Sequence, residues 1–426
     1  MSVNKTVVMH THRATPTPAV LAYPMHGQTK FTTEGYRTRD AHLVEWLGRL
    51  TGDRGGVAVV SRPEPAVLAV GASWPGGRGR RGGGRRRPAQ LGGAPGVAAG
   101  TRPIETTTWR LPDPRDRRRW WVRSADAYPG LPHAWRDVPA VVWNPFTALA
   151  LPHANPFVTG RTTVLDLLDD WTVHHAFAGI RPDVERAYAA AFASACQVTA
   201  NAEGTVELAR RFGRDDVVLL PNGCDPERFD STSAATGPLT VGYVGKIGRR
   251  LDLGGIVACA EAEPDVRFVF AGPVLDREYH RPLAALPNVT LLGDVHYDDV
   301  PALLRTFDVG WVPHRVGSGE RAGGRGGGGG AEVGGEVGGD IIKTYEYRAA
   351  GLPVLTTPVD GCDRRGLDEV AVLPIDRHAE RIGDWHRSGP RVARRPATIP
   401  REATWRLKAE TVLGALAPAT VARNPR

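Results

Sequence analysis

Short runs of β-branched and other apolar residues alternate with longer stretches of helical spacing along most of the chain. Buried strands of a parallel sheet read as short continuous apolar runs, and the helices that connect them read as amphipathic stretches, so the alternation predicts βαβ units. In the first half, strands are expected at residues 19–23, 57–60, 120–122, 140–143, 163–168, 197–199 and 217–220. Helices are expected at residues 39–50, 182–195 and 203–212.

The pattern restarts after a cluster of turn residues, PNGCDPER, and a polar stretch that ends near residue 237, which indicates a domain boundary. Beyond it, strands are expected at residues 239–244, 266–271, 289–292, 309–312 and 354–356, and helices at residues 252–263 and 401–415. A chain of 426 residues also suits two domains better than one. We therefore predict an α/β protein with two doubly wound parallel sheets, one in residues 1–228 and one in residues 237–400.

Most of the positive charge lies in one segment. The formal net charge is +8, and six arginines lie in the tract GGRGRRGGGRRRP, so the rest of the chain carries +8 − 6 = +2. The low-complexity insertion at residues 76–100 and the glycine-rich loop at residues 317–339 can bury too little apolar surface to offset their ordering entropy, which predicts mobile loops. The arginines favour a solvated insertion first, an anionic membrane surface second and nucleic acid last.

The cellular location is predicted from what the sequence lacks. No uninterrupted apolar run approaches the ~20 residues that cross a bilayer, and residues 1–20 do not have the regions of a secretory signal. The four cysteines are widely spaced and form no CxxC pair, so we expect reduced thiols without a disulfide or zinc site. These observations predict a cytoplasmic protein, with peripheral binding to the inner face of the membrane as an extension of that prediction.

The segment DIIKTYEYRAAGLPVLTT carries the most informative side chains. A helix that begins near residue 342 places Lys343 and Glu346 one turn apart on one face, close to its N-terminus. The free N–H groups of a helix N-terminus suit a phosphate, and Lys343 adds a full positive charge. Glu346 can accept hydrogen bonds from two adjacent hydroxyls, as in a ribose. The alternative is a surface ion pair between residues i and i+3.

Two further turns follow strands of the second predicted sheet, at the edge where doubly wound sheets bind ligands. In GYVGKIGRR, Gly245 would let the backbone approach a diphosphate, and Lys246, Arg249 or Arg250 would neutralise it. A simple strand-to-helix turn explains this pattern equally well. In GDVHY, the backbone could contact a nucleobase, and His296 is either part of that site or a surface histidine.

The first half offers carboxylates at the end of a strand. In VLDLLDDWTVHH, Asp169 and Asp170 could act as a general base on an acceptor hydroxyl, or they could only cap a helix. A metal site is less favoured, because no third ligand has suitable spacing. The polar loop after the first strand, HGQTKFTTEGYRTRDAH, supplies the acceptor-side candidates Gly27, Arg39, Asp40 and His42.

These segments resemble the donor domain of GT-B glycosyltransferases, particularly family 4-like and bacterial polysaccharide glucuronosyltransferase-like enzymes. The matching elements are, in order, VGYVGKIGRRLDL, FVFAGPV, LPNVTLLGDVHYDDVPALLRTFDVGWVP and IKTYEYRAAGLPVLTT. The first half matches more loosely, through TVLDLLDDW, ERAYAAAFASACQVTANAEG and VVLLPNGCDPERF. The resemblance covers residues 140–416.

The resemblance implies two Rossmann-like domains that face each other across a cleft, with residues 401–426 returning to the first domain. It implies that Lys343 and Glu346 contact the diphosphate and ribose of the donor, and it adds Gly272 to the donor-binding residues. A glutamate that many family members carry eight positions before Glu346 is Gly338 here, and Asp340 is the candidate replacement.

The function implied by the resemblance is a metal-independent transfer of a hexosyl group from a UDP- or GDP-sugar to the hydroxyl of a glycan or lipid-linked acceptor, in the biosynthesis of cell-surface polysaccharide. No cofactor is expected beyond this nucleotide-sugar co-substrate. Two alternatives stay open: a catalytically silent nucleotide-sugar-binding protein, and a sugar-nucleotide epimerase of the same architecture.

Overall fold

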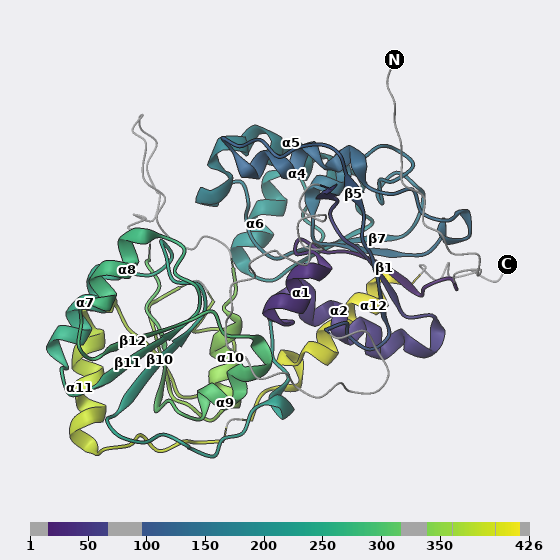
Figure 1. The fold of residues 1–426 in the computed structure, drawn as a ribbon. Helices are drawn as coiled ribbons and strands as arrows, with labels where there is room; N and C mark the ends of the chain where they lie inside the picture. The colour runs from purple at the N-terminus through teal and green to yellow at the C-terminus, as the bar shows by residue number, and fades with distance from the viewer. Residues whose placement is uncertain (1–15, 67–95, 317–338, 360, 397, 418–426) are drawn as a thin grey trace, which may run out of the picture.

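The computed structural model describes residues 16–66, 96–316, 339–359, 361–396 and 398–417. It has two lobes, each built around one parallel sheet, as Figure 1 shows. Of the two segments predicted to be mobile, residues 76–95 and 317–338 are not described by the structure, and Gly338 is one of these residues. No helix of the described segments is both long and apolar enough to cross a membrane.

The first lobe contains a seven-stranded sheet in which all neighbouring strands are parallel. Its strands are, in spatial order, β4 (Thr101–Ile104), β2 (Val57–Val60), β1 (Val20–Tyr23), β6 (Ala140–Val142), β7 (Thr163–Leu167), β8 (Gln197–Ala200) and β9 (Val217–Leu219). The main helices are α1 (Gln28–Glu34), α2 (Arg39–Thr51), α4 (Trp120–Arg123), α5 (Arg181–Ser194) and α6 (Glu203–Arg211). The strand order reverses between β1 and β6, and such a reversal opens a crevice at the carboxyl ends of the strands.

The second lobe contains a six-stranded parallel sheet in the order β12 (Val289–Gly293), β11 (Arg267–Ala271), β10 (Thr240–Val244), β13 (Val309–Val312), β14 (Val354–Thr356) and β15 (Val370–Val372). Its helices are α7 (Leu253–Ala262), α8 (Arg277–Ala284), α9 (Val300–Leu304), α10 (Ile342–Ala349) and α11 (His378–Ser388). In Figure 1, α7, α8 and α11 cover one face of this sheet, and α9 and α10 cover the other. The order reverses between β10 and β13, so this lobe also has a crevice at its carboxyl edge.

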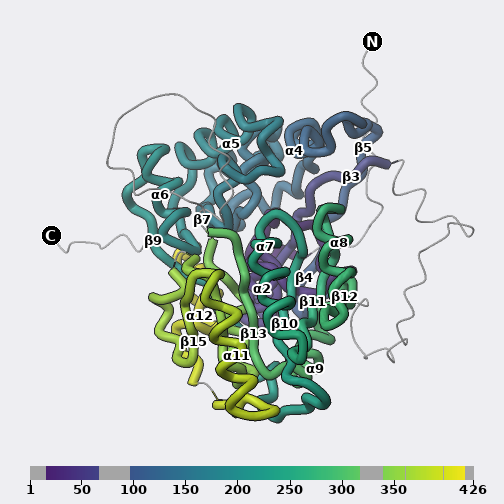
Figure 2. Tube along the Cα trace, turned by 90° about the vertical axis from the view of Figure 1, so that its left-hand side faces the viewer, coloured from purple at the N-terminus to yellow at the C-terminus, as the bar shows by residue number. Residues whose placement is uncertain are grey.

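The last helix, α12 (Trp405–Leu416), leaves the second lobe and packs on α2 of the first. Trp405, Ala409, Val412 and Leu416 belong to the core of the first lobe, and Trp405 is fully buried. Burial of a large apolar side chain stabilises a fold by about 1.5–3 kcal/mol, so α12 ties the two lobes together. In the turned view of Figure 2, α5 and α6 lie at one end of the molecule and α9 and α11 at the other.

The structure agrees with most of the predicted strands and corrects one. The strand predicted at residues 120–122 is wrong, because Trp120–Arg123 forms the helix α4. Asp116 accepts a hydrogen bond from the backbone N–H of Arg118 and starts the preceding 3-10 turn, and the side chains of Trp120 and Trp121 are both buried. A short apolar run does not distinguish a strand from a buried helical turn.

Candidate functional site

A cavity of about 990 Å³ lies between the lobes and is lined by both of them. On the first lobe it is lined by residues that follow β1 and β7, including Gly27 and Asp169. On the second lobe it is lined by the ends of β10 and β11 and by the start of α10. The cavity therefore opens at the carboxyl edges of both sheets, and its volume is at the upper end of the ~300–1,000 Å³ usual for small-molecule sites.

Lys343 and Glu346 lie on one face of α10, as the helical spacing predicted, and both line this cavity. Glu346 is buried, and its Oε1 accepts a hydrogen bond of 2.7 Å from the hydroxyl of Tyr297. The Nζ of Lys343 lies 5.2 Å from the centre of the Tyr243 ring, which is a cation–π distance. The pair faces the space between the lobes instead of bulk solvent.

The carboxyl group of Glu346 has an altered acidity. Burial raises its pKa from the ordinary value of 4.5 to about 7, although the hydrogen bond from Tyr297 and the charge of Lys343 act in the opposite direction. Desolvation disfavours the charged form of a carboxyl group. Glu346 is therefore ready to ionise near neutral pH when a bound ligand offers it further hydrogen bonds.

Two glycines let the loops of the second sheet meet. Gly245 and Gly272 have φ angles of 149° and 154°, which L side chains rarely adopt. A Cβ atom on Gly272 would lie 1.8 Å from the backbone oxygen of Gly245. Gly245 lines the cavity together with Lys246 and Arg249, whereas Gly272 lies behind it and supports the turn. The absence of a side chain at Gly272 allows this close approach of two backbones, and glycine at both positions allows the positive φ angles.

The cavity is rich in positive charge from both lobes. Three of the five lysines of the chain line it, namely Lys30 on α1, Lys246 after β10 and Lys343 on α10. Burial first, and the charge of Lys246 second, lower the pKa of Lys30 to about 7. Like charges that face one another in a partly desolvated cleft favour the binding of an anion, because the anion relieves their repulsion.

Asp169 and Arg39 also reach the cavity wall. The Oδ2 of Asp169 accepts a 2.9 Å hydrogen bond from Arg250, so this ion pair joins the first lobe to the second. Arg39 holds both carboxylate oxygens of Asp166 at 2.8 Å, and the two side chains are almost fully buried. This pairing gives Arg39 a structural task, which its position in a polar loop did not reveal.

Two predicted carboxylates do not reach the cavity. Asp40 is fully buried and accepts hydrogen bonds from the backbone and ring nitrogens of His26, which itself lines the cavity. Asp170 is buried, forms an ion pair with Arg211 and accepts a hydrogen bond from Thr172. A buried carboxylate needs such partners. We therefore correct the predicted positions: Asp170, expected in the reaction centre, and Asp40, expected on the acceptor side, are both supporting residues outside the cavity.

Two predicted histidines also lie elsewhere. His42 is fully buried and stacks on Trp405 of α12 with the ring centres 4.7 Å apart, so it belongs to the joint between α2 and α12 instead of to the acceptor side. His296 precedes the 3-10 turn Tyr297–Asp299, where its Nδ1 accepts a 3.3 Å hydrogen bond from the backbone N–H of Asp298. Neither histidine lines the cavity, which corrects both predictions of position.

Among the described residues, one cluster of three side chains could hold a metal ion. It consists of His42, Glu45 and Asp225, whose ligand atoms lie within 4.8 Å of one another. Arg228 already bridges the two carboxylates, at 2.6 Å from Glu45 and 2.8 Å from Asp225. A guanidinium thus occupies the place of a cation, away from the cavity. Metal independence of the reaction stays a prediction.

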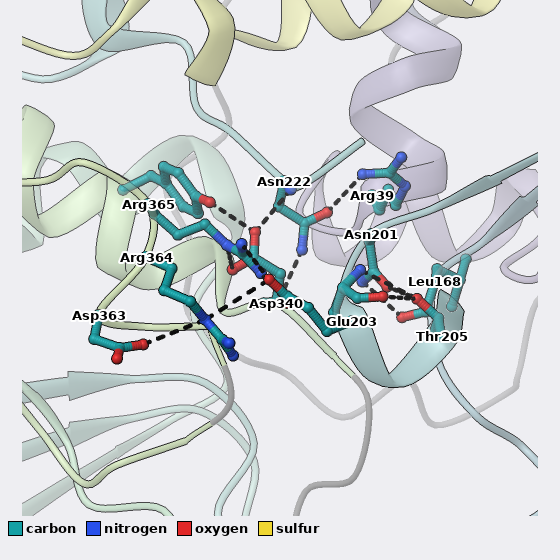
Figure 3. Close-up of polar contacts among 12 residues, drawn as sticks. Arg39, Leu168, Asn201, Glu203, Thr205, Asn222, Asp340, Asp363, Arg364 and Arg365 are labelled. Atoms are coloured by element: carbon teal, nitrogen blue, oxygen red, sulfur yellow. Dashed lines mark hydrogen bonds and ion pairs between the residues drawn. The ribbon is translucent and has the colours of Figure 1, made fainter. Parts of the chain in front are cut away.

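Figure 3 shows a polar cluster that joins the lobes. Two of its members, Asn222 and Asp340, line the cavity. Asp340 accepts hydrogen bonds from the backbone N–H of Asn222 at 2.8 Å and from Arg365 at 3.2 Å. Arg365 also forms a bidentate pair with Glu203 of the first lobe, at 2.8 and 3.1 Å. Both carboxylate oxygens of Asp340 accept hydrogen bonds from the protein itself, so this residue helps to hold the lobes together. The sequence had instead suggested Asp340 as a replacement for the missing glutamate.

Sequence reasoning did not single out Lys30 or the cluster around Asp340. The sequence QTKFTTE did not suggest α1, because threonine and phenylalanine are weak helix formers. The one available signal was the rarity of lysine in this arginine-rich chain.

We compared the amino-acid sequence with those of known proteins. No family model matches the chain. It is 26% identical over 156 residues to the putative teichuronic acid biosynthesis glycosyltransferase TuaH of Bacillus subtilis, a match that covers 34% of this chain and 35% of that protein. The chain thus matches only about a third of the length of this curated relative.

The whole chain is similar in structure to proteins with low sequence identity. It matches the sucrose-phosphate synthase of Thermosynechococcus elongatus with a TM-score of 0.62 and 14% identity, over 94% of this chain and 96% of that one. It matches HepE of Anabaena, solved in complex with UDP and glucose, with a TM-score of 0.54 and 15% identity, over 94% and 97% of the two chains. The chain has the GT-B fold. This confirms the predicted class of fold and, at the level of the fold, the predicted resemblance to GT-B glycosyltransferases.

The GT-B fold also accounts for the position of the cavity. Two doubly wound sheets present their carboxyl edges, where such sheets usually bind ligands, to the cavity between the lobes. Lys343, Glu346 and Lys246 come from the second lobe, while Lys30 and Asp169 come from the first.

Proposed function

We propose that the protein is a glycosyltransferase that transfers a sugar from a UDP- or GDP-sugar to a hydroxyl group of a glycan or lipid-linked acceptor. The observation that carries the proposal is the convergence of Lys343, Glu346 and Lys246 on one cavity between two Rossmann-like lobes. Support comes from the curated relative, which is named as a glycosyltransferase, and from HepE, which has been solved with UDP-glucose.

Each group has a task that follows from its chemistry. The diphosphate of the donor would lie against Lys343, Lys246 and the N-terminus of α10, and the negative charge that develops on the leaving diphosphate would be stabilised there. The carboxylate of Glu346 would accept hydrogen bonds from two ribose hydroxyls. Closure of the lobes around the donor would exclude water and limit hydrolysis.

The proposal is tested by incubating the protein with a panel of UDP- and GDP-sugars, with and without p-nitrophenyl glycosides as acceptors. We expect release of the nucleoside diphosphate and a new glycoside with one donor. A donor that binds without any turnover would identify a silent nucleotide-sugar-binding protein instead. Release of an epimerised nucleotide sugar without an acceptor would identify an epimerase.

Asp169 is the carboxylate of the first lobe that we propose to orient or deprotonate the acceptor hydroxyl. Its ion pair with Arg250 keeps a carboxylate oxygen at the cavity wall. Asp169→Asn should lower kcat about 100-fold or more, since positioned general bases contribute ~10²–10⁴-fold, while the affinity for UDP stays within about twofold. The matched control is Asp183→Asn, which also removes a carboxylate paired with an arginine but lies outside this cavity. Unchanged kcat in Asp169→Asn would remove this role.

The contribution of Glu346 to UDP binding should increase as the pH rises from 6 to 8. The folded pKa of Glu346 is about 7, and the ribose favours the ionised form, which accepts two hydrogen bonds. About a tenth of the carboxyl groups are ionised at pH 6 and about nine tenths at pH 8, so this group alone should lower Kd about ninefold. Calorimetric titration of the wild type and of Glu346→Gln at both pH values separates this effect from ionisation of UDP itself. An equal pH dependence in both proteins would contradict it.

For a lipid-linked acceptor we propose that the first lobe meets an anionic membrane surface. Trp109 and Leu111 are 69% and 57% exposed, and the exposed arginines Arg117 and Arg119 follow them. Tryptophan is enriched at membrane interfaces, and each arginine near an anionic surface contributes about 1 kcal/mol.

In a sedimentation assay, vesicles with phosphatidylglycerol should bind the protein several-fold better than neutral vesicles. The double variant with Trp109→Ala and Leu111→Ala should reduce this binding. Val158→Ala, which changes a side chain 56% exposed, is the control. Equal binding to both vesicles would overturn the proposal.

A further inference from the structure

The cavity continues on the first lobe beyond the groups that the proposed donor would use. This part of its wall is made by two short 3-10 turns that pack against each other, Arg117–Arg119 and His175–Ile180, and by the end of β2. Its lining combines arginine with aromatic rings and includes Arg62, Arg118, Trp121, His174, His175 and Phe177, with the carboxylate of Glu64 beside Arg62.

The two guanidinium groups lie on aromatic rings. The Cζ of Arg62 is 3.9 Å from the centre of the Trp121 ring, and the Cζ of Arg118 is 5.3 Å from the centre of the Phe177 ring. Cation–π contacts of this kind hold a guanidinium in place at its flat face and leave the N–H groups at its edge available. Both arginines are therefore positioned to present donors to the cavity.

The N–H groups of these arginines are incompletely used. The Nε of Arg62 is buried without a hydrogen-bond partner among the described residues, while its Nη2 donates to Glu64 at 3.3 Å. Within the same described residues, no carboxylate lies within ion-pair distance of Arg118, and the nearby Asp116 pairs with Arg119. A buried N–H group without a partner costs free energy that a bound acceptor atom would recover.

The surroundings are positive from both sides of the cleft. His175 lies at the same wall, and burial first, then the charges of Arg250 and Arg249, lower the pKa of its imidazole, although the charge of Asp276 acts in the opposite direction. Arg250 and Arg249 belong to the second lobe, so cations of both lobes line this region together with the carboxylates of Glu64 and Asp276. An anion placed here would interact favourably with each of these cations.

We propose that this part of the cleft, defined by Arg62, Arg118 and His175, is a subsite for an acceptor sugar that bears a carboxylate or phosphate group. The anionic group would accept hydrogen bonds from Arg62 and Arg118, and a hydroxyl of the same sugar would face Asp169. The inference rests on the proposed function, because it names the class of acceptor for the same cleft.

The arrangement favours an anionic sugar over a neutral one. A neutral sugar ring usually gains its binding energy by stacking on an exposed aromatic face, but here the guanidinium groups cover the faces of Trp121 and Phe177. A guanidinium edge matches the geometry of a carboxylate or phosphate, and charge-assisted hydrogen bonds of this type are about twice as strong as neutral ones.

The subsite is tested by titrating simple sugars into the whole protein saturated with UDP, so that the donor's phosphate site is filled. Methyl β-D-glucuronide tests the carboxylate, glucose 6-phosphate tests the phosphate, and methyl β-D-glucoside is the neutral reference. Saturation-transfer NMR should show binding of at least one anionic sugar and about tenfold weaker or no binding of the glucoside. Equal binding of all three sugars would overturn the proposal.

The residue test compares two neighbours in one turn. Arg118→Gln should weaken binding of the anionic sugar about tenfold, whereas Arg117→Gln, which changes an exposed arginine outside the cavity, should leave it unchanged. Arg62→Gln provides a second variant with the same expected loss. If the anionic sugar binds equally well to the wild type, to Arg118→Gln and to Arg62→Gln, the proposal is overturned.

Failure of the subsite and failure of the proposed function give different results. If UDP binds and Lys343→Met weakens that binding, but no anionic sugar binds, only the subsite is wrong. If an anionic sugar binds through Arg118 but no nucleotide binds, the proposed function is wrong and the anion site remains.

Discussion

Lys343→Met is expected to weaken the binding of UDP about 10- to 100-fold while the protein stays folded. The ammonium group lies at the start of α10 and faces the cavity, and its removal deletes a charge-assisted contact with the diphosphate. Such contacts contribute about 1.5–3 kcal/mol, which corresponds to that loss of affinity. Methionine keeps an apolar stem of similar length beside the Tyr243 ring. Calorimetric titration of UDP at low ionic strength measures the effect.

The matched control for this change is Arg381→Met. Arg381 also lies over an aromatic ring, at 4.4 Å from the centre of Trp385, but on α11 and outside the cavity. It should bind UDP as the wild type does. If both variants lose UDP binding equally, the loss comes from damage to the second lobe, and the role of Lys343 at the donor would be contradicted.

Arg39→Ala should lower the free energy of unfolding by about 3–5 kcal/mol, because it leaves Asp166 as an unpaired buried carboxylate. The side chains of Arg39 and Asp166 are 2% and 0% exposed, and two hydrogen bonds of 2.8 Å join them. Asp166 also accepts hydrogen bonds from Trp143 and Thr199, so it sits at the centre of a buried network between β6, β7 and β8. Urea unfolding followed by tryptophan fluorescence measures the change.

The matched control is Arg54→Ala, which breaks an exposed ion pair. Arg54 and Asp53 are 64% and 82% exposed, and removal of such a surface pair changes stability by less than about 1 kcal/mol. A stable Arg39→Ala protein that has lost transfer activity would restore Arg39 to the acceptor side, where the sequence placed it.

The fold could be predicted from the sequence because its information is local. A run such as VLAY, which forms β1 with all four residues buried, is short, apolar and followed by turn residues, and the same holds for most strands of both sheets. The helix α10 was also predictable, since its spacing alone puts Lys343 and Glu346 on one face. Family resemblance then indicated that this face looks into a cleft.

The first-lobe side of the site could not be predicted in the same way. Asp40, His42 and Asp170 are polar residues in suitable loops, but their partners His26, Trp405 and Arg211 are brought to them only by the tertiary structure. Whether a polar side chain faces a cavity or a buried partner depends on contacts between distant segments.

The arginine-rich wall of the first lobe could not be predicted from the sequence either. Arg62 and Arg118 are 56 positions apart in the sequence, 118 − 62, and neither belongs to a motif. Trp121 follows Arg118 by three positions, but it packs on Arg62, and the ring beside Arg118 is that of Phe177 from a third segment, so only the packed structure assembles the subsite.

The central claim is that a nucleotide sugar lies between the lobes on Lys343 and Glu346, and a crystal structure of the protein with bound UDP tests it most directly. The account predicts the diphosphate within hydrogen-bonding distance of Lys343 and Lys246, with both ribose hydroxyls donating to Glu346. UDP bound elsewhere on the molecule, with the side chains of Lys343 and Glu346 making no contact with it, would contradict the account.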